Sequence, residues 1–349
     1  MKVFEALMHR PILCSVAIAY IVFCVVYIWR MKKKFRAFAK IRDSKFQCID
    51  PDPKKFNSIL VFMGMLILLI PRLVGCLVFS LLYMIMAYSF SAFSHTTLKN
   101  KIQKKISSIL TRIILFFGGI IKINIRQFNN IDWQKYPKIR QSNVKLAPVV
   151  ISNHIGYIDI VFAMHMFYSS FISSNHVLKI PIVRVAAKST HCLFLDRKSK
   201  TDKDAIMLQI KERVDKISDD TNQILYSPLA IFPEGICHNQ KYVTVFKRGA
   251  FSPLKPIQPI FISLRSCRWQ SSYYFFDLIE DIIAILSNPY EILDGVLLPK
   301  IEPITTDPTE YSNEVRKLYI DSFNLIPAEL DIFERDKYIQ NFRKVYQNL

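Results

Sequence analysis

Two histidines in the 349-residue chain each stand five positions before an aspartate, His154 before Asp159 and His191 before Asp196. A histidine beside a carboxylate can take a proton from a hydroxyl at neutral pH, because the acid fixes the tautomer and stabilises the imidazolium that forms. On a continuous helix, five positions would point the two side chains about 140° apart. Either pair can therefore work together only if the chain turns between its members.

The sequence after His191 gives no such turn. His191 is followed by the apolar run Cys192–Leu195, which is typical of a strand. An extended chain would carry Asp196 roughly 16 Å away from the imidazole. We interpret His191 as structural or incidental.

The sequence around His154 does allow a turn. His154 follows the apolar run at 148–151, and Gly156 permits a tight turn that brings Asp159 back to the imidazole. We predict His154 as a general base and Asp159 as its orienting partner. Asn153 either orients this loop or is an ordinary turn residue.

A second group of candidates follows another apolar run, in the segment IFPEG at 231–235. Pro233 holds the preceding residue extended, and Gly235 lets a ligand approach the backbone. Glu234 would then project from the carboxyl end of a strand, where α/β sheets bind ligands. FPEG alone is more often a plain turn.

Three cations are candidates for phosphate binding. Lys247 and Arg248 precede a glycine in VFKRGAF, and Arg197 closes LFLDR near a predicted strand end. The alternative for the first two is a solvated surface pair.

Short apolar runs alternate with amphipathic stretches from about residue 126, which indicates an α/β domain. The predicted buried strands cover 148–151, 192–195, 229–232 and 257–264. A helix is predicted over 201–218, with Thr201 and Asp204 as its cap. Its buried face would consist of Ile206, Ile210, Val214 and Ile217.

The net charge of +19 is concentrated in the most apolar third of the chain. Residues 1–125 hold 19 Lys and Arg against 4 Asp and Glu, a net of +15, whereas the remainder carries +4. Cations that flank hydrophobic segments do not form the aromatic-lined basic groove of a single-strand binder, so we exclude nucleic acid as a partner. The seven cysteines include no CxxC pair and indicate neither disulfides nor a metal site.

The first apolar segment, Pro11–Trp29, has 19 residues without a charge, close to the length that crosses a bilayer. A cleaved signal peptide is the alternative, but five cations between positions 30 and 36 follow in place of a cleavage site. The positive-inside tendency puts this cluster in the cytosol and the N-terminus outside.

The second apolar segment covers 32 residues, 59–90, with Arg72 as its one charge. A straight helix of this length would be about 48 Å long, and Pro71 favours a break. We predict a re-entrant hairpin, with a single span as the alternative. The following segment, 106–121, is either an interfacial helix or a buried helix of the next domain.

Taken together, the motifs resemble the membrane-bound glycerolipid acyltransferases, and most closely the lysophosphatidylcholine acyltransferase branch. The family carries NHxxxxD, a strand ending in Asp-Arg, FPEG and a proline-containing final strand, in this order. The matching residues are Asn153-His154 with Asp159, Leu195-Asp196-Arg197, Phe232 to Gly235, and Gln258-Pro259-Ile260. Ile236 and His191 stand where the family usually has threonine and glycine.

The resemblance implies transfer of a fatty acyl group from acyl-CoA to the free hydroxyl of a lysophospholipid. His154 and Asp159 would be the catalytic residues, Arg197, Glu234 and Gly235 the acceptor-binding residues, and Lys247 and Arg248 our own candidates for CoA or lipid phosphate. Backbone amides near the His154 turn would stabilise the oxyanion. Acyl-CoA is a co-substrate, and neither a cofactor nor a metal is implied.

Two other functions are compatible with these residues. The acceptor could be lysophosphatidic acid or glycerol 3-phosphate, or the chain could be a non-catalytic lipid-binding scaffold. Residues 326–349 contain no EF-hand loop, so calcium control within the chain is not expected.

The expected fold is α/β, a glycerolipid acyltransferase-like domain with a mixed sheet flanked by helices, preceded by transmembrane or re-entrant helices. We predict an N-terminal anchor and basic linker at 1–58, a membrane hairpin and interfacial helix at 59–125, the acyltransferase domain at 126–330 and a tail at 331–349. The family implies an integral protein of the endoplasmic reticulum, and the positive flanks of the apolar segments predict that the catalytic domain faces the cytosol.

Overall fold

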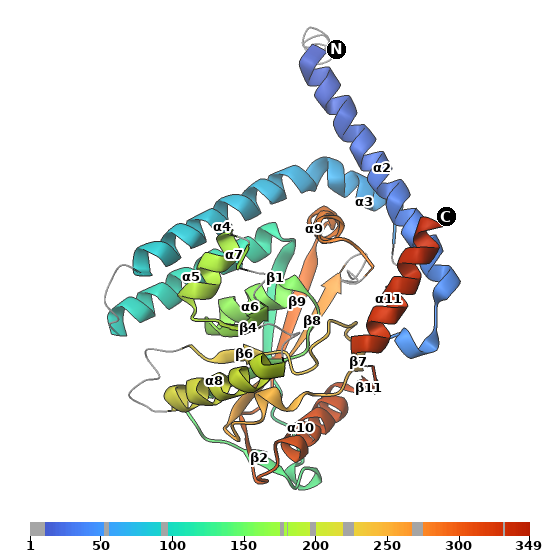
Figure 1. The fold of residues 1–349 in the computed structure, drawn as a ribbon. Helices are drawn as coiled ribbons and strands as arrows, with labels where there is room; N and C mark the ends of the chain where they lie inside the picture. The colour runs from blue at the N-terminus through green and yellow to red at the C-terminus, as the bar shows by residue number, and fades with distance from the viewer. Residues whose placement is uncertain are drawn as a thin grey trace.

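The computed structural model describes residues 11–51, 56–91, 97–174, 178–179, 181–195, 200–218, 227–266, 275–330 and 332–349. Its centre is a mixed sheet with helices on both faces, as the sequence predicts (Figure 1). The main path of the sheet runs β1-β9-β8-β3-β6-β4-β5, and β10 joins β2 to β8. The strands are β1 (Ile120–Gln127), β2 (Ile139–Gln141), β3 (Val149–Ser152), β4 (Ser170–Ser174), β5 (Leu193–Leu195), β6 (Leu229–Ile231), β8 (Ile257–Ser266), β9 (Glu291–Leu297) and β10 (Ile301–Pro303).

The strands that end at the His154 turn are parallel. β3 pairs in parallel with β6 on one side and with β8 on the other. β9 runs antiparallel to β8, which makes the sheet mixed. A short two-stranded pair, β7 (Tyr242–Val243) with β11 (Ile326–Pro327), lies apart from it. The carboxyl ends of β3 and β6 therefore meet at one edge, where His154 and Glu234 follow them.

Alternation along β3 explains the two helical layers. Val149 and Ile151 are buried in a cluster with α8 (Lys200–Ser218) and α10 (Pro308–Phe323). Val150, between them, is buried with α5 (Thr97–Phe117) and α6 (Tyr157–Phe167). A strand that is apolar on both faces is the pattern expected of a buried parallel strand. The remaining helices near the domain are α7 (Pro181–Ser189), α9 (Leu278–Ser287) and α11 (Ile332–Gln347).

The predicted elements are found within a residue or two of their expected positions. The four predicted strands are β3, β5, β6 and β8, and the predicted helix is α8. The predicted apolar face of α8 is buried at Ile206, Ile210, Val214 and Ile217. The proposed cap, Thr201 with Asp204, involves side chains outside the described set.

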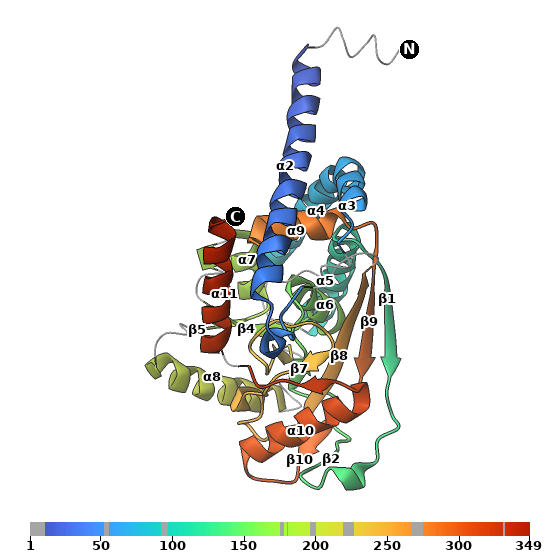
Figure 2. The same cartoon turned by 90° about the vertical axis from the view of Figure 1, so that its right-hand side faces the viewer.

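The N-terminal helix α2 spans Pro11–Ile41 and extends away from the domain (Figure 2). Its apolar residues are mostly exposed. Its most apolar stretch of 18 residues has a mean hydropathy of 2.5 and is 11% buried, so the helix is long and apolar enough to cross a membrane. The helix continues through the basic cluster that we expected to be a linker. Met31 and Phe38 are buried there beside the domain and α11.

The second apolar segment is one bent helical run. It consists of α3 (Ser58–Gly64), a π-helical turn η3 (Met65–Leu69) and α4 (Ile70–Ser91). The expected break at Pro71 and the re-entrant hairpin built on it are wrong, since the chain stays helical through this residue. Widening of the turn just before Pro71 accommodates a residue that lacks a backbone N–H. The run is the second candidate membrane span, with a mean hydropathy of 2.4.

Both ends of the domain differ from the predicted boundaries. α5 packs against α4 and α6, and Leu115 belongs to the core. These contacts favour a buried helix over an interfacial helix for the predicted segment 106–121. β1 begins at Ile120 and is paired with β9, six residues before the expected start of the domain. The predicted tail forms α11, whose Tyr338 and Phe342 lie four apart and are buried against α2. A four-residue spacing places both rings on one helix face.

Candidate active site

His154 lies in the loop between β3 and α6, in direct contact with Asp159. The distance from Nδ1 of His154 to Oδ2 of Asp159 is 2.7 Å. Asp159 is fully buried, whereas 22% of the His154 side chain is exposed. The carboxylate therefore fixes the proton on Nδ1, which leaves the lone pair of Nε2 as the basic position.

The turn that joins the pair forms as the sequence predicts. Gly156 has a φ of +150°, which L side chains rarely adopt, and no atom lies within 4 Å of where a Cβ would stand. The same oxygen of Asp159 accepts hydrogen bonds from the backbone amides of Ile155 at 2.7 Å and Gly156 at 3.1 Å. These two amides are thus engaged with the carboxylate, and an oxyanion donor must come from elsewhere.

Asn153 ties this loop to the neighbouring strand. Its side chain donates to the carbonyl oxygen of Ile262 at 2.8 Å and accepts from the amide of Ile262 at 2.7 Å. The buried side-chain amide of Asn153 thus makes the two hydrogen bonds to β8 that the backbone of a neighbouring strand would otherwise make. Of the two interpretations of Asn153, orientation of the catalytic loop is the one that the contacts support.

The imidazole is held on its face as well as at its edge. The ring of Phe232 stacks on His154 with centroids 4.3 Å apart and planes at 12°. Burial by itself would lower the pKa of His154, but the charge of Asp159 outweighs it and raises the pKa above its ordinary value. The thiol of Cys237 also hydrogen-bonds with this ring, and burial raises the pKa of that thiol.

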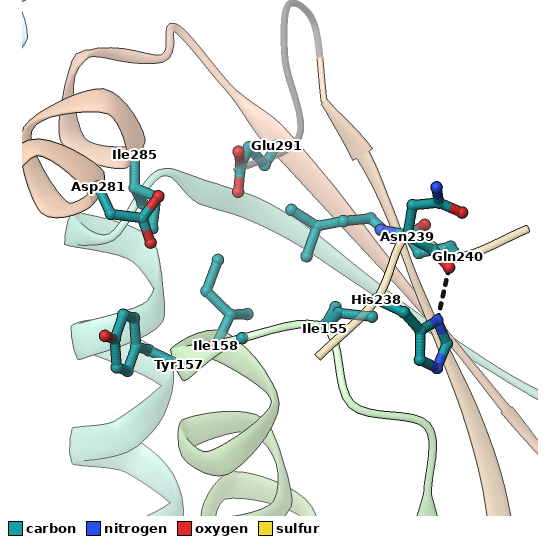
Figure 3. A pocket seen from close by; sticks show the side chains of 11 residues that line it. Ile155, Tyr157, Ile158, His238, Asn239, Gln240, Asp281, Ile285 and Glu291 are labelled. Atoms are coloured by element: carbon teal, nitrogen blue, oxygen red, sulfur yellow. Dashed lines mark hydrogen bonds between the residues drawn. The ribbon is translucent and has the colours of Figure 1, made fainter. Parts of the chain in front are cut away.

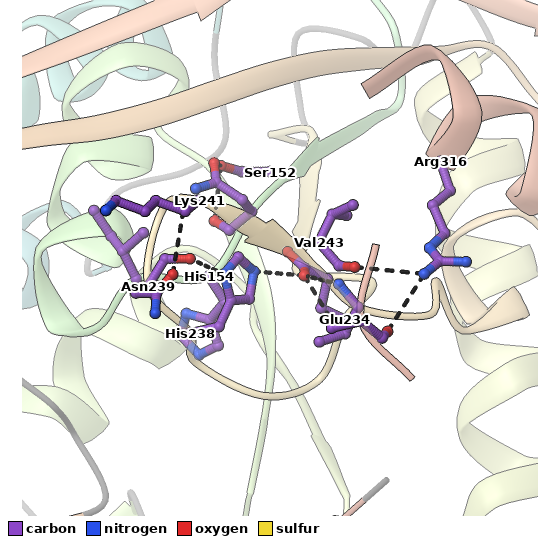
Figure 4. A network of polar contacts seen from close by, with 12 residues as sticks. Ser152, His154, Glu234, His238, Asn239, Lys241, Val243 and Arg316 are labelled. Atoms are coloured by element: carbon purple, nitrogen blue, oxygen red, sulfur yellow. Dashed lines mark hydrogen bonds and ion pairs between the residues drawn. The ribbon is translucent and has the colours of Figure 1, made fainter. Parts of the chain in front are cut away.

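Glu234 lies inside the loop that follows Phe232, and Figure 4 shows its contacts. One carboxylate oxygen accepts hydrogen bonds from the amide and the hydroxyl of Thr244, at 2.8 and 3.1 Å. The same oxygen lies 2.5 Å from Nε2 of the buried His238. Burial would lower the pKa of His238, but the charge of Glu234 outweighs it and raises the pKa.

The Glu234 loop is also bonded to the His154 turn, because the amide of His238 donates to the carbonyl oxygen of His154 at 3.0 Å. Glu234 therefore positions the loop that lies against His154. A direct contact between Glu234 and an acceptor stays a prediction.

The other predicted residues fall into two sets. Gly235 has a φ of +67°, and a Cβ there would lie 2.7 Å from Nζ of Lys247. The ammonium of Lys247 thus lies over the glycine of FPEG, and Arg248 is exposed next to it. Arg197, with Asp196, lies outside the described residues. His191 is exposed in a left-handed turn after α7.

Comparisons with known proteins agree with this geometry. Residues 134–263, which include His154, Asp159 and FPEG, match the family model "Acyltransferase". These residues form an acyltransferase domain.

Relatives of this acyltransferase domain include Lysophospholipid acyltransferase LPEAT1 of Arabidopsis thaliana, 28% identical over 66% of this chain and 61% of the relative. Lysophospholipid acyltransferase LPCAT4 of Mus musculus is 22% identical over 64% of this chain and 40% of the relative. The chain thus matches between two fifths and three fifths of the length of these curated relatives. Among solved structures, the 1-acyl-sn-glycerophosphate (LPA) acyltransferase PlsC from Thermotoga maritima covers 72% of this chain and is itself covered to 97%, with a TM-score of 0.45 and 13% identity.

Several residues of the acyltransferase site were missed from the sequence. Cys237, His238 and Thr244 contact His154 or Glu234, yet none of them belongs to a motif whose spacing predicts the contact. Two buried acids, Asp281 and Glu291, line a pocket beside the His154 turn although they follow it by more than a hundred positions. The sequence signal that could have revealed them is their setting, since both acids stand in an otherwise apolar stretch of the chain.

Proposed function

We propose that the chain transfers a fatty acyl group from acyl-CoA to the free hydroxyl of a lysophospholipid. The observation that carries this proposal is the contact between an accessible His154 and a buried Asp159 at 2.7 Å. It lies within a domain whose family and relatives are acyltransferases. The resemblance of the motifs favours a lysophosphatidylcholine-type acceptor.

In this proposal His154 acts as the general base. Nε2 takes the hydroxyl proton while the hydroxyl oxygen attacks the thioester carbonyl carbon, which forms a tetrahedral intermediate. The intermediate collapses when the carbon–sulfur bond breaks, and the imidazolium returns the proton to the CoA thiolate. The products are an ester and free CoA, with no covalent acyl-enzyme, and acyl-CoA is a co-substrate with no resident cofactor.

The membrane delivers both lipid substrates in this account. α2 and the α3–α4 run expose apolar surface, which suits insertion into a bilayer. Lipids confined to that bilayer reach the site at a raised effective concentration. We propose that the protein lies in the endoplasmic reticulum with the acyltransferase domain in the cytosol. This orientation requires that α2 crosses the bilayer while the α3–α4 run, which packs against α5 and α7, lies in the bilayer without crossing it.

The alternative acceptors are lysophosphatidic acid and glycerol 3-phosphate. The observation that favours them is the exposed pair Lys247 and Arg248 beside Gly235. Both acceptors carry a phosphate without a headgroup, which bears more negative charge and would bind two cations more strongly. A non-catalytic scaffold is the alternative of another class. The contact of His154 with Asp159 argues against it, because a scaffold has no need for an oriented base.

An assay of acyl transfer tests the proposal. Membranes that contain the chain would be incubated with labelled acyl-CoA and, separately, lysophosphatidylcholine, lysophosphatidylethanolamine, lysophosphatidic acid and glycerol 3-phosphate. We expect labelled product with at least one lysophospholipid and none in membranes that lack the chain. No transfer to any acceptor by folded, membrane-bound protein would support the scaffold.

A further inference from the structure

A small pocket adjoins the turn that follows His154 (Figure 3). The residues Ile155 to Ile158, directly after His154, form one of its walls. Helix α9 and the start of β9 form the other wall and contribute Asp281, Ile285 and Glu291. Its cavity volume is about 50 Å³, which exceeds what one water molecule needs.

Glu291 is an unusual residue to find in such a wall. Its side chain is buried, with 3% of the residue exposed, and Oε1 accepts a hydrogen bond from the side-chain amide of Asn288 at 2.8 Å. Its Oε2 has no hydrogen-bond partner in the part of the chain that the structure describes. Burial raises the pKa of Glu291 to about 7. Hydrogen bonds of its carboxyl group with Asn288 and Ser266 and the charge of Arg72 lower the pKa, and the charge of Asp281 raises it. A buried carboxylate oxygen without a partner is costly unless a ligand supplies one.

Glu291 is not the only acidic side chain in the described wall of the pocket. Asp281 adds a second buried carboxylate, with 2% of the residue exposed. Arg72 is the cation whose charge acts on Glu291, but its guanidinium is bonded to the backbone. It donates to the carbonyl oxygens of Leu286 at 3.0 Å and of Pro289 at 2.7 Å, as well as to that of Asn288. His238 lines the opposite wall, where the carboxylate of Glu234 offsets its charge.

Helix α9, which carries Asp281, also has an exposed apolar face beside a candidate membrane span. Leu278, Ile279 and Ile282 of α9 are exposed, and the helix packs beside α3. An amphipathic helix with an exposed apolar face next to a candidate membrane span is positioned at the lipid surface. A lipid that enters along α9 would reach the pocket and the His154 turn together.

We propose that this pocket binds the ammonium end of a zwitterionic lysophospholipid headgroup, with Glu291 and Asp281 as the residues that determine acceptor choice. The inference rests on the proposed function, because it names the acceptor of the same site. In such a lipid the phosphate and a two-carbon arm separate the ammonium from the glycerol. The hydroxyl can thus lie at His154 while the ammonium lies against the adjoining wall.

The wall chemistry favours ethanolamine over choline. A primary ammonium donates hydrogen bonds to carboxylate oxygens, and such charge-assisted bonds are short and strong. A quaternary ammonium has no proton to donate and is recognised mainly by aromatic rings. Tyr157 is the one aromatic residue among the described residues that line this pocket.

The test compares acceptors of the same acyl chain that differ only in headgroup, using Glu291→Gln in the full chain. This change keeps the shape and removes the charge. We expect kcat/KM with lysophosphatidylethanolamine to fall about tenfold to a hundredfold, as for loss of a hydrogen bond to a charged group. The value with lysophosphatidic acid should stay within about twofold. Glu302→Gln, on β10 outside the pocket, is the matched control and should change neither value.

Two outcomes of this test would support the inference and two would overturn it. Selective loss with lysophosphatidylethanolamine supports an ethanolamine headgroup, and an equal loss with lysophosphatidylcholine supports the same site with choline. An equal loss with every acceptor, or a wild-type preference for lysophosphatidic acid, overturns the pocket assignment while acyl transfer itself stands.

A binding measurement separates the inference from the proposed function. Labelled lysophosphatidylethanolamine would be titrated onto purified His154→Ala protein in nanodiscs, with and without Glu291→Gln. Weaker binding in the double variant, but not for lysophosphatidic acid, supports the pocket even if no acceptor is turned over. Equal binding of both lipids by both proteins overturns it.

Discussion

At the scale of single residues, one oxygen of Asp159 holds His154, the histidine that we propose as the general base. Oδ2 accepts from the ring of His154 and from the amides of Ile155 and Gly156. These contacts fix the carboxylate to the backbone, and the carboxylate in turn fixes the imidazole. A residue with such contacts should influence both the rate of transfer and its dependence on pH.

We expect Asp159→Asn to lower kcat/KM at neutral pH by at least about a hundredfold, because the tautomer and the positive charge on His154 lose their partner. The base must be neutral, so activity rises as the pH passes through the pKa of His154. Asp159 raises that pKa, and burial lowers it. The acidic limb of the profile should therefore shift to lower pH in the variant.

Profiles of kcat/KM against pH for the wild type, Asp159→Asn and Asp132→Asn check this prediction. Asp132 is exposed at the start of a short helical turn, so its variant should behave as the wild type. An unshifted acidic limb in Asp159→Asn would show that another group controls the profile.

The buried pair of Glu234 and His238 predicts a pH-dependent stability. Glu234→Gln removes the charge that raises the pKa of His238, and breaking a buried pair costs about 3–5 kcal/mol. The pair stabilises fully below the unfolded pKa of about 6.5 and loses this contribution as the pH rises through the raised folded pKa. Thermal unfolding in detergent should therefore show a larger loss at pH 6 than at pH 9.

An exposed acid is the control for this measurement. Glu329, whose side chain is 75% exposed beside Arg316, should tolerate replacement by glutamine at both values of pH. A loss from Glu234→Gln that is the same at pH 6 and pH 9 would contradict the assigned charge of His238.

How far the sequence could predict these residues depends on distance along the chain. His154 and Asp159 are separated by a short turn, so the type and spacing of the residues sufficed. Glu291 and Asp281 reach the same turn only because β9 pairs beside β8 and α9 precedes it. No local pattern contains that pairing, and the pocket could not be derived without the fold.

At the scale of elements, α2 is joined to the domain by a buried ion pair. Nζ of Lys34 lies 2.5 Å from Oε2 of Glu280 on α9, and both residues are buried. The helix that we expect to anchor the protein thus contacts the helix that lines the pocket.

A double-mutant cycle should reveal this coupling. Lys34→Met and Glu280→Gln should each lower the free energy of unfolding, because each leaves a buried charge with only a longer ion pair, Glu280 with Arg30 at 3.5 Å or Lys34 with Asp277 at 3.7 Å. The double variant should lose less than the sum of the two, by about 1 kcal/mol or more. The exposed pair Lys45 and Glu334, also 2.5 Å apart, is the control and should couple by less than about 1 kcal/mol. Additive losses for the first pair would contradict a structural link between α2 and α9.

The elements themselves were predicted where periodicity is strong. β3, β6 and β8 are apolar runs with clear ends, and α8 has one apolar face, so both types follow from the sequence. β1 and α11 were missed because their burial depends on partners far along the chain, β9 and α2. The helical course through Pro71 was missed because a π-helical turn has no sequence signal as plain as proline itself.

At the scale of the whole molecule, the orientation in the membrane is a prediction from charge. Five cations between positions 30 and 36 follow the apolar part of α2, and the positive-inside tendency keeps them in the cytosol. We expect a glycosylation acceptor placed near residue 200 to stay unmodified and one placed before residue 11 to be modified. A mobility shift of the protein on gels, reversed by glycosidase, measures each. Modification near residue 200 would overturn the cytosolic assignment.

The measurement that tests the central claim most directly is acyl transfer by His154→Ala beside His191→Ala. Both variants would be assayed in membranes with labelled acyl-CoA and the preferred lysophospholipid, at matched protein levels. His154 contacts Asp159, whereas His191 is exposed in a turn after α7. We predict that transfer falls by about a hundredfold or more in the first variant and stays near the wild-type rate in the second. Full activity in His154→Ala would contradict the assignment of His154 as the base.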